Sequence, residues 1–246
     1  MIRVQGVTDV GLVRKENQDA YAVMEGLDSG HTICVVCDGM GGAAGGKLAS
    51  RIAVTTYLET LESVLKASMD PEQLREASSY AVSMANRAIR DAAGESPEYS
   101  GMGTTLVSAV IYQDGAVITN VGDSRAYHIT GGEITRITRD HSLVQSMVER
   151  GDITAEEARR HPNRNLITRA LGPDIDAECD GYICPLAAGD FLLLCSDGLV
   201  NTVTDPEILT EVLRGEGLEQ SLERLMQIAK DHGAPDNVTA VLVQML

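Results

Sequence analysis

Aromatic residues are scarce in this sequence, and tryptophan is missing altogether. Phe and Tyr together supply only 3% of the 246 residues, and there is a single Phe. Aliphatic side chains must therefore fill the interior, and a hydrophobic content of 43% is enough to build a sizeable core. A chain of this length fits one large domain, so we expect residues 1–246 to form a single domain.

Basic residues are also few compared with acidic ones. The chain has 20 Lys and Arg against 36 Asp and Glu, which gives a net charge of −16. Nucleic-acid backbones and anionic membranes are bound by clustered positive charge, so we expect neither as a partner. The acidic surplus favours a soluble monomer, and it also provides possible ligands for hard cations.

Long hydrophobic runs and paired cysteines are lacking too. No apolar run approaches the length of a membrane span, and residues 1–10 lack the apolar segment of a secretion signal. The odd count of five cysteines favours a reducing compartment, so we expect a cytoplasmic protein. Cys34 and Cys37 have CxxC spacing, but strand positions i and i+3 point to opposite faces. We interpret them as buried apolar groups.

The short apolar runs predict an antiparallel β-structure. Glycine-containing turns such as Asp114-Gly115 and Gly131-Gly132 separate several of these runs, and such turns are typical of hairpins. The predicted strands comprise residues 2–7, 20–24, 32–37, 104–111, 116–121, 125–129, 133–137, 191–195 and 238–244.

Helical patterns come in pairs between these strands. Residues 47–66 have apolar side chains near helical spacing, and a second helix opens at Asp70, with Pro71 at its first position and Gln73 placed to close a capping box. Two further helices are predicted over residues 206–213 and 218–231. Helix pairs grouped between hairpins predict an α+β fold in which stacked antiparallel sheets are flanked by helices.

Residues 142–169 form a polar, compact segment between sheet elements. Two short helices are predicted in it, at residues 142–150 and 154–161, and a Thr154/Glu157 capping box opens the second. We interpret this segment as a surface flap, which is a natural place for substrate contacts.

Four aspartates lie beside predicted strand ends, each next to a Gly or Asn: Asp38, Asp123, Asp197 and Asp236. Any one of them alone is more simply a turn residue. Four together are harder to explain in that way, because strand ends of stacked sheets can gather at one edge of the core. Carboxylates gathered there would repel one another unless cations neutralised them.

Oxygen ligands without a His/Cys set favour Mg²⁺, Mn²⁺ or Ca²⁺ over Zn²⁺. Two such ions can activate a water and stabilise an in-line displacement at phosphorus. Gly39 lets its own carbonyl approach an ion closely. Arg14 can hold a phosphate through two parallel hydrogen bonds, although position alone also fits a solvated surface charge.

An ordered set of motifs extends this argument over residues 7–237. Together the motifs resemble the bacterial branch of the metal-dependent serine/threonine protein phosphatases of type 2C. They are Arg14-Lys15-Glu16-Asn17-Gln18-Asp19, Asp38-Gly39-Met40-Gly41-Gly42, Met102-Gly103-Thr104-Thr105, Gly122-Asp123-Ser124-Arg125, Asp140-His141-Ser142, the run from Asn165 to Gly172, Ser196-Asp197-Gly198-Leu199 and Asp236-Asn237.

The resemblance implies a four-layer α-β-β-α sandwich and hydrolysis of phosphoserine and phosphothreonine in proteins by a metal-bridging hydroxide. It implies two core Mn²⁺ or Mg²⁺ ions with a possible third, phosphorylated proteins as substrates, and a serine/threonine kinase as counterpart. The implied roles are phosphate binding for Arg14, a bridge between the metals for Asp38, a carbonyl ligand for Gly39, ligands of the other metal for Asp197 and Asp236, a contact through water for Asp19, and a third site for Asp123 with Asp197. Residues 142–169 would be the flap of the family.

One position departs from many eukaryotic members of the family, which have a proposed general-acid His where this chain has Met40. Methionine cannot donate a proton, so metal-bound water is the first alternative. His141 and His161 are further alternatives, although each fits a packing role at a helix end or in the flap.

Two other functions have some support in the sequence. Residues 39–44 fit the G-x-G-x-x-A fingerprint of dinucleotide-binding oxidoreductases, and Glu59 follows at a suitable distance. Asp38 would repel a pyrophosphate there, and the hairpins do not fit a parallel sheet. A catalytically dead phosphopeptide-binding module is the other alternative, but every implied ligand position retains its aspartate.

Overall fold

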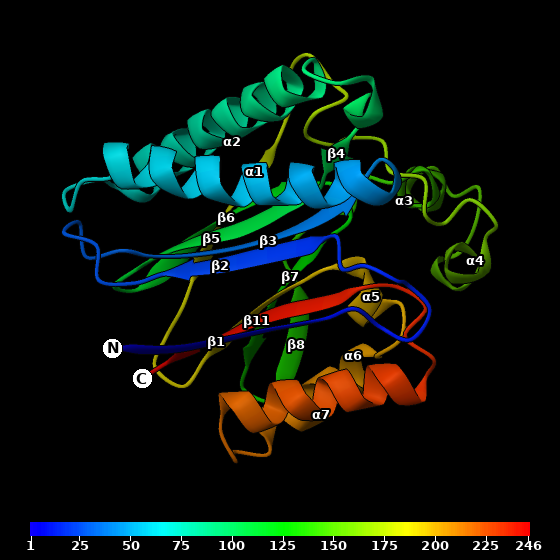
Figure 1. The fold of residues 1–246 in the computed structure, drawn as a ribbon. Coiled ribbons are helices and arrows are strands. Elements are labelled where there is room, and N and C mark those ends of the chain that lie inside the picture. Colours follow the sequence, from blue (N-terminus) through cyan, green and yellow to red (C-terminus); the bar gives the residue numbers. More distant parts are fainter.

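The computed structural model describes the backbone of residues 1–246 and every side chain except those of Ala43 and Ala44, the last two residues of the G-x-G-x-x-A match. Two antiparallel sheets are stacked face to face, and each is covered on its outer side by a pair of helices (Figure 1). The predicted four-layer α+β sandwich is therefore confirmed. Every pairing among the described strands is antiparallel, so the parallel unit of a dinucleotide-binding enzyme does not occur here.

The upper sheet in Figure 1 has the strand order β2-β3-β5-β6-β9, with the short β4 paired to β3. Helices α1 and α2 cover it. Its elements are β2 (Asp19–Met24), β3 (Thr32–Met40), β4 (Gly103–Thr104), β5 (Leu106–Tyr112), β6 (Gly115–Val121), β9 (Asp180–Pro185), α1 (Gly42–Val64) and α2 (Pro71–Ala93), with the 3₁₀ turn η1 (Pro97–Tyr99) after α2.

The lower sheet has the strand order β1-β11-β10-β7-β8, so the first and last strands of the chain are neighbours and both termini lie on one side (Figure 1). Helices α6 and α7 cover its outer face. Its elements are β1 (Ile2–Asp9), β7 (Arg125–Thr130), β8 (Glu133–Arg136), β10 (Phe191–Cys195), β11 (Val238–Met245), α5 (Asp197–Val200), α6 (Asp205–Leu213) and α7 (Leu218–Asp231).

Strand β3 connects two of the three layers of the core. Ile33, Val35 and Cys37 pack against α1 and α2, whereas Cys34 and Val36 face the other sheet. The alternation follows from the two-residue period of a strand, and it confirms that Cys34 and Cys37 lie on opposite faces. A third apolar layer fills the space between the lower sheet and α6 and α7.

Several element boundaries differ from the sequence prediction. The expected strand 104–111 is two strands, β4 and β5, because Thr105 leaves the ladder and binds the backbone of Asp38 instead. Strand β9 was not predicted, since it is an edge strand and only one of its six residues is buried. Helix α1 begins at Gly42 rather than near Lys47. The sequence did not indicate this start, because glycine disfavours helix and adds no apolar side chain to the pattern.

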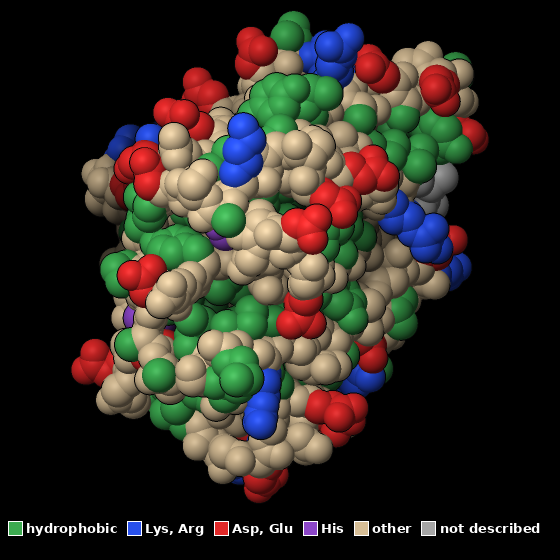
Figure 2. Space-filling view, turned by 90° about the vertical axis from the view of Figure 1, so that its left-hand side faces the viewer, with side chains coloured by type: hydrophobic (Ala, Val, Ile, Leu, Met, Phe, Trp, Pro, Cys, Tyr) green, Lys and Arg blue, Asp and Glu red, His purple; other side chains and the backbone are tan. Residues whose placement is uncertain are grey.

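The helix starts were better defined by sequence. Capping boxes close at Asp70 and Gln73 in α2 and at Thr154 and Glu157 in α4 (Ala155–Arg160), as predicted. Helix α4 and α3 (Leu143–Glu149) belong to the predicted flap and project from one side of the sandwich (Figure 1). None of the described helices is long and apolar enough to cross a membrane. Acidic and basic side chains are interspersed on the face in Figure 2.

Tyr57 provides a test of the polar contacts inside this apolar core. Its hydroxyl lies 2.6 Å from that of Ser108, and both residues are fully buried. We expect Tyr57→Phe to lower the free energy of unfolding by about 1–3 kcal/mol, because Ser108 is left without this partner. Urea unfolding would measure the change. Tyr80→Phe, on the exposed face of the same helix pair, should change it by less than about 0.5 kcal/mol.

Candidate metal centre and active site

Most of the predicted site residues line one cavity of about 500 Å³ at an edge of the sandwich. Its lining includes Arg14, Asp38, Gly39, Asp123, Asp197 and Asp236. These residues come from separate parts of the chain: the β1–β2 loop, β3, the turn after β6, the start of α5 and the residues before β11. The expectation that the acidic positions meet at one edge of the core is therefore confirmed.

Asp19 lies beneath this cavity rather than in its wall. It is paired with Asp38 across β2 and β3 and is 9% exposed. Its Oδ2 atom accepts hydrogen bonds from Ser196 Oγ at 2.8 Å and from Thr239 Oγ1 at 2.7 Å. Its Oδ1 atom is buried and has no hydrogen-bond partner in the described part of the chain. One carboxylate oxygen is thus fixed, and the other is left for a ligand.

The carboxyl groups of the site disfavour one another's ionised form. Burial, followed by the charges of Asp19 and Asp197, raises the pKa of Asp38 well above its ordinary value. Burial raises the pKa of Asp19 to about 6, and burial together with the charge of Asp197 raises that of Asp123. A group of buried carboxyls without compensating positive charge is costly, so the arrangement fits bound cations.

The donor set fits hard cations that keep part of their water shell. Among the described residues, no three Asp, Glu, His or Cys side chains converge closely enough to hold an ion by themselves. One or two carboxylates per ion, completed by carbonyl and water oxygens, are the usual protein ligands of Mg²⁺. The second unpartnered oxygen among the described residues of the site is Oδ1 of Asp197, a residue that lines the cavity, and it is available as such a ligand.

Glycine is required at two of these positions by close backbone contacts. A Cβ atom on Gly39 would lie 2.1 Å from the carbonyl oxygen of Gly46 in α1. One on Gly198 would lie 1.9 Å from the carbonyl oxygen of Asn237. Close packing is therefore a second reason for glycine at position 39, besides the carbonyl role predicted from sequence. Both contacts also bring the acidic residues of neighbouring elements together.

Asn237 fixes the loop that carries Arg14. Its Nδ2 atom donates to the carbonyl oxygens of Val10 at 2.9 Å and Glu16 at 3.0 Å, and its Oδ1 atom accepts from the backbone N–H of Gln18 at 2.8 Å. Arg14 at the tip of this loop is half exposed, and its Nη2 atom lies 2.7 Å from Asp236 Oδ2. Its guanidinium group is therefore held at the rim of the cavity.

Three supporting residues were not singled out from the sequence. Ser196 and Thr239 orient Asp19, and Asn237 orients the Arg14 loop. Ser196 and Asn237 each belong to a motif that also contains a site aspartate, so their adjacency to the ligands was visible. Thr239 had no such signal, because only the packing of β11 against β2 brings it to Asp19.

The predicted flap is anchored beside the acidic cavity. His141, which is buried, accepts a hydrogen bond at Nδ1 from the N–H of Gly122 and lies 3.2 Å from Asp180 at Nε2. Asn165 and Ile167, from the far end of the flap, line the cavity itself. His161 accepts from the N–H of Asn163 within the flap. Neither histidine is among the residues that line the cavity, so packing roles stay the interpretation of both.

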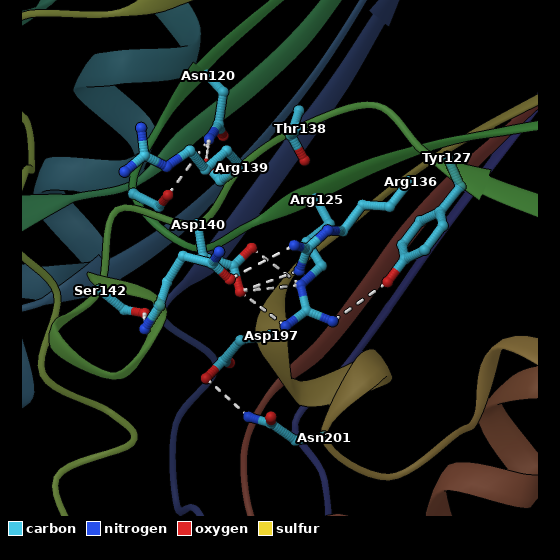
Figure 3. A network of polar contacts seen from close by, with 12 residues as sticks. Asn120, Arg125, Tyr127, Arg136, Thr138, Arg139, Asp140, Ser142, Asp197 and Asn201 are labelled. Atoms are coloured by element: carbon cyan, nitrogen blue, oxygen red, sulfur yellow. Dashed lines mark hydrogen bonds and ion pairs between the residues drawn. The ribbon is translucent and has the colours of Figure 1, made fainter. Parts of the chain in front are cut away.

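A largely buried ion pair lies at the root of the flap. Arg125 binds Asp140 through Nε at 3.0 Å and Nη2 at 2.7 Å, and its Nη1 atom lies 3.2 Å from the Tyr127 hydroxyl (Figure 3). Next to this pair, Asn201 donates a hydrogen bond to Asp197 Oδ2 at 2.9 Å (Figure 3). These contacts orient Asp140 through Arg125 of β7 and the cavity residue Asp197 through Asn201, which directly follows α5.

Comparison with known proteins adds independent findings. The family profile of protein phosphatase 2C matches residues 13–246. Serine/threonine phosphatase stp of Listeria monocytogenes is 36% identical over 238 residues, which is 96% of this chain and 93% of that protein.

Solved structures are similar over the whole chain. The S. agalactiae serine/threonine phosphatase superposes with a TM-score of 0.93 at 32% identity and covers 100% of both chains. The catalytic domain of the serine/threonine protein phosphatase PstP, solved in complex with two manganese ions, gives a TM-score of 0.82 at 34% identity, covering 99% of this chain and 97% of that one. With this agreement of profile, sequence and fold, the chain belongs to the protein phosphatase 2C family and is a metal-dependent serine/threonine protein phosphatase.

Proposed function

We propose that the acidic cavity is the catalytic centre, where two Mn²⁺ or Mg²⁺ ions and Arg14 act together on phosphoserine and phosphothreonine side chains of proteins. One observation carries this proposal: four aspartates from four separate segments line the same cavity as an arginine. The manganese ions of the related PstP structure support the choice of metal. Phosphorylated side chains fit such a site because their anionic oxygens bind both cations and a guanidinium group.

Each acidic residue has a proposed role that agrees with its surroundings. Asp38, which the other carboxyls surround, would contact both ions, and the Gly39 carbonyl would complete one of them. Asp197, through its unpartnered Oδ1 atom, and Asp236 would hold the other ion. Asp19 would reach the ions through a water molecule from its own free Oδ1 atom.

A third ion is proposed between Asp123 and Asp197. Both line the cavity, and the charge of Asp197 is one cause of the raised pKa of Asp123. An ion bound between them would relieve this repulsion.

The bound ions would supply the nucleophilic water and neutralise charge that develops on the phosphoryl group. Arg14 would hold the phosphate and orient it for in-line displacement. Its ion pair with Asp236 keeps the guanidinium group in place for this purpose. Met40 lines the cavity but cannot donate a proton, so we propose that water protonates the leaving alkoxide.

The alternative of a dead phosphopeptide-binding module has less support. All the aspartates of the motif set are present, and two of them keep an oxygen atom without a hydrogen-bond partner among the described residues. A module that only bound phosphate would not need this costly group of buried carboxyls.

We further propose that residues 1–246 act as one monomeric catalytic domain, with residues 142–169 as its flap. A net charge of −16 supports a monomer that does not self-associate, and the five free cysteines support a cytoplasmic location. A serine/threonine kinase is the proposed counterpart, since such an enzyme produces phosphorylated proteins of this kind. We propose neither nucleic acid nor an anionic membrane as a partner, because the net charge of −16 would disfavour binding to either.

Asp38→Asn tests the metal centre. We expect metal-dependent hydrolysis of a phosphothreonine peptide to fall by on the order of 10³-fold, because the charge shared by both ions is removed. The rise in melting temperature that Mn²⁺ gives the unmodified protein should also largely disappear. Asp114→Asn, an exposed turn aspartate, is the control. Near-normal turnover by the Asp38 variant would refute the assignment.

Arg14→Ala tests phosphate binding. We expect KM for a phosphopeptide to rise by about tenfold, with a smaller loss of kcat, since a charge-assisted contact to the ground-state phosphate is lost. Steady-state phosphate release would measure both constants, with Arg51→Ala on the exposed side of α1 as control. A loss confined to kcat would contradict the proposed role.

Thr239→Val tests the support of Asp19. The substitution keeps the shape of the side chain but removes the hydroxyl that donates to Asp19 Oδ2. We expect Mn²⁺ affinity, measured by titration calorimetry, to fall by about tenfold. Thr239→Ser retains the hydroxyl and should bind Mn²⁺ nearly as well as the unmodified chain. Equal affinities for the Val and Ser variants would show that this hydrogen bond does not matter.

A further inference from the structure

A second cavity, of about 440 Å³, lies between the flap helices and the α5–α6 segment. Asp123 and Asp197 line this cavity and the catalytic cavity alike. The two cavities therefore adjoin, and a protein segment whose phosphorylated residue occupied the first would have the second beside it. We call this second cavity the flap groove.

The flap groove differs from the catalytic cavity in its chemistry. The flap contributes Val144, Val148 and Ala158 to its lining, and the α5–α6 segment contributes Val200 and Val203. Its inner carboxylate Asp140 is already neutralised by two arginines, Arg125 and Arg136 (Figure 3). Because Asp140 is already paired and the wall is apolar, the other charged residues of the groove determine which charge its ligand carries.

Two arginines supply the remaining positive charges. The remaining negative ones come from Asp205 and from Asp123 and Asp197 of the catalytic cavity, whose charge the proposed metal ions would offset. Eight arginines occur between residues 125 and 169. Six of them form ion pairs with Asp or Glu: Arg125, Arg136, Arg139, Arg150, Arg160 and Arg169. The other two, Arg159 and Arg164, have no ion pair or side-chain hydrogen bond within the described part of the chain. Both are exposed, and both line the flap groove.

Among the eight arginines of residues 125–169, these two are the exceptions, although the chain has 36 acidic residues against 20 basic ones. The surplus of carboxylates makes an internal partner easy to provide, as the neighbouring Arg160 shows by pairing with Glu156. Arg159 and Arg164 are thus free to bind an external anion. Because the net charge of −16 repels acidic ligands elsewhere, any attraction for them must be local to these arginines.

We propose that the flap groove binds acidic side chains that flank the phosphorylated residue of a protein substrate, with Arg159 and Arg164 as their partners. The apolar wall contacts the aliphatic part of the same segment. This inference rests on the phosphatase function and adds a substrate preference to it: glutamate or aspartate near the phosphorylated residue.

The test compares two phosphothreonine peptides that are identical except for Glu or Gln at the flanking positions. With Mn²⁺ present, we expect kcat/KM of the unmodified enzyme to favour the Glu peptide by about three- to tenfold at low salt, and less at high salt. In the double variant Arg159→Gln/Arg164→Gln the ratio should fall to about one or below. A general loss of activity cancels in this ratio, so it reports on recognition alone.

Arg150→Gln/Arg160→Gln is the matched control, because these two flap arginines are ion-paired and do not line the groove. It should keep the preference of the unmodified enzyme. A charge-reversed variant, Arg159→Glu/Arg164→Glu, should favour a Lys-flanked peptide over the Glu peptide. An unchanged ratio in the Gln double variant, or an equal loss in the control, would overturn the proposal. If the unmodified enzyme hydrolysed neither peptide, the phosphatase function itself would fail.

Discussion

Carboxylates that leave water lose hydration energy and, when they meet, repel one another. In this protein the repulsion is concentrated at one edge of a sandwich, where Asp19, Asp38, Asp123 and Asp197 all have raised pKa values. A fold tolerates such a cost only if the surrounding structure fixes the groups and a ligand offsets the charge. The rest of the architecture can be understood as the means of holding this unfavourable cluster in place.

The scaffold does so with rigid elements rather than with long loops. Asp19 and Asp38 lie opposite each other on adjacent strands, and hydroxyls of two further strands or strand ends hold Asp19. Gly39 and Gly198 have no side chain, which lets the backbone of adjoining elements approach closely. Tight packing therefore also positions the proposed metal ligands, because Gly39 and Gly198 directly follow Asp38 and Asp197 in the sequence.

The flap has a different physical character. Its helices are short, its side chains are mostly half-buried or exposed, and it is joined to the sandwich at its root by His141 and by backbone contacts to Gly122. Such a segment contributes little to the core, so its outer residues can serve recognition without a large effect on stability. Its unpaired arginines are the clearest sign of this freedom, since nearly every other arginine around them is committed to an internal ion pair.

The sequence by itself determined the fold class, most element types and the identity of the acidic residues. Strand alternation, hairpin turns and capping residues are local signals, and the order of motifs around Asp38 indicated the family. It did not reveal β9, an exposed edge strand, or the short helix that starts at Asp197, because neither has a strong apolar pattern.

Only the tertiary structure decided how these parts meet. It brought Thr239 to Asp19 from the opposite end of the chain and made Asn237 the anchor of the Arg14 loop. It also left Arg159 and Arg164 beside a groove without an ion pair to any side chain that the structure describes. The physical reason is that ionic and hydrogen-bonding partners are selected by distance in space. A sequence specifies which groups are available, but only packing determines which of them are paired and which remain free.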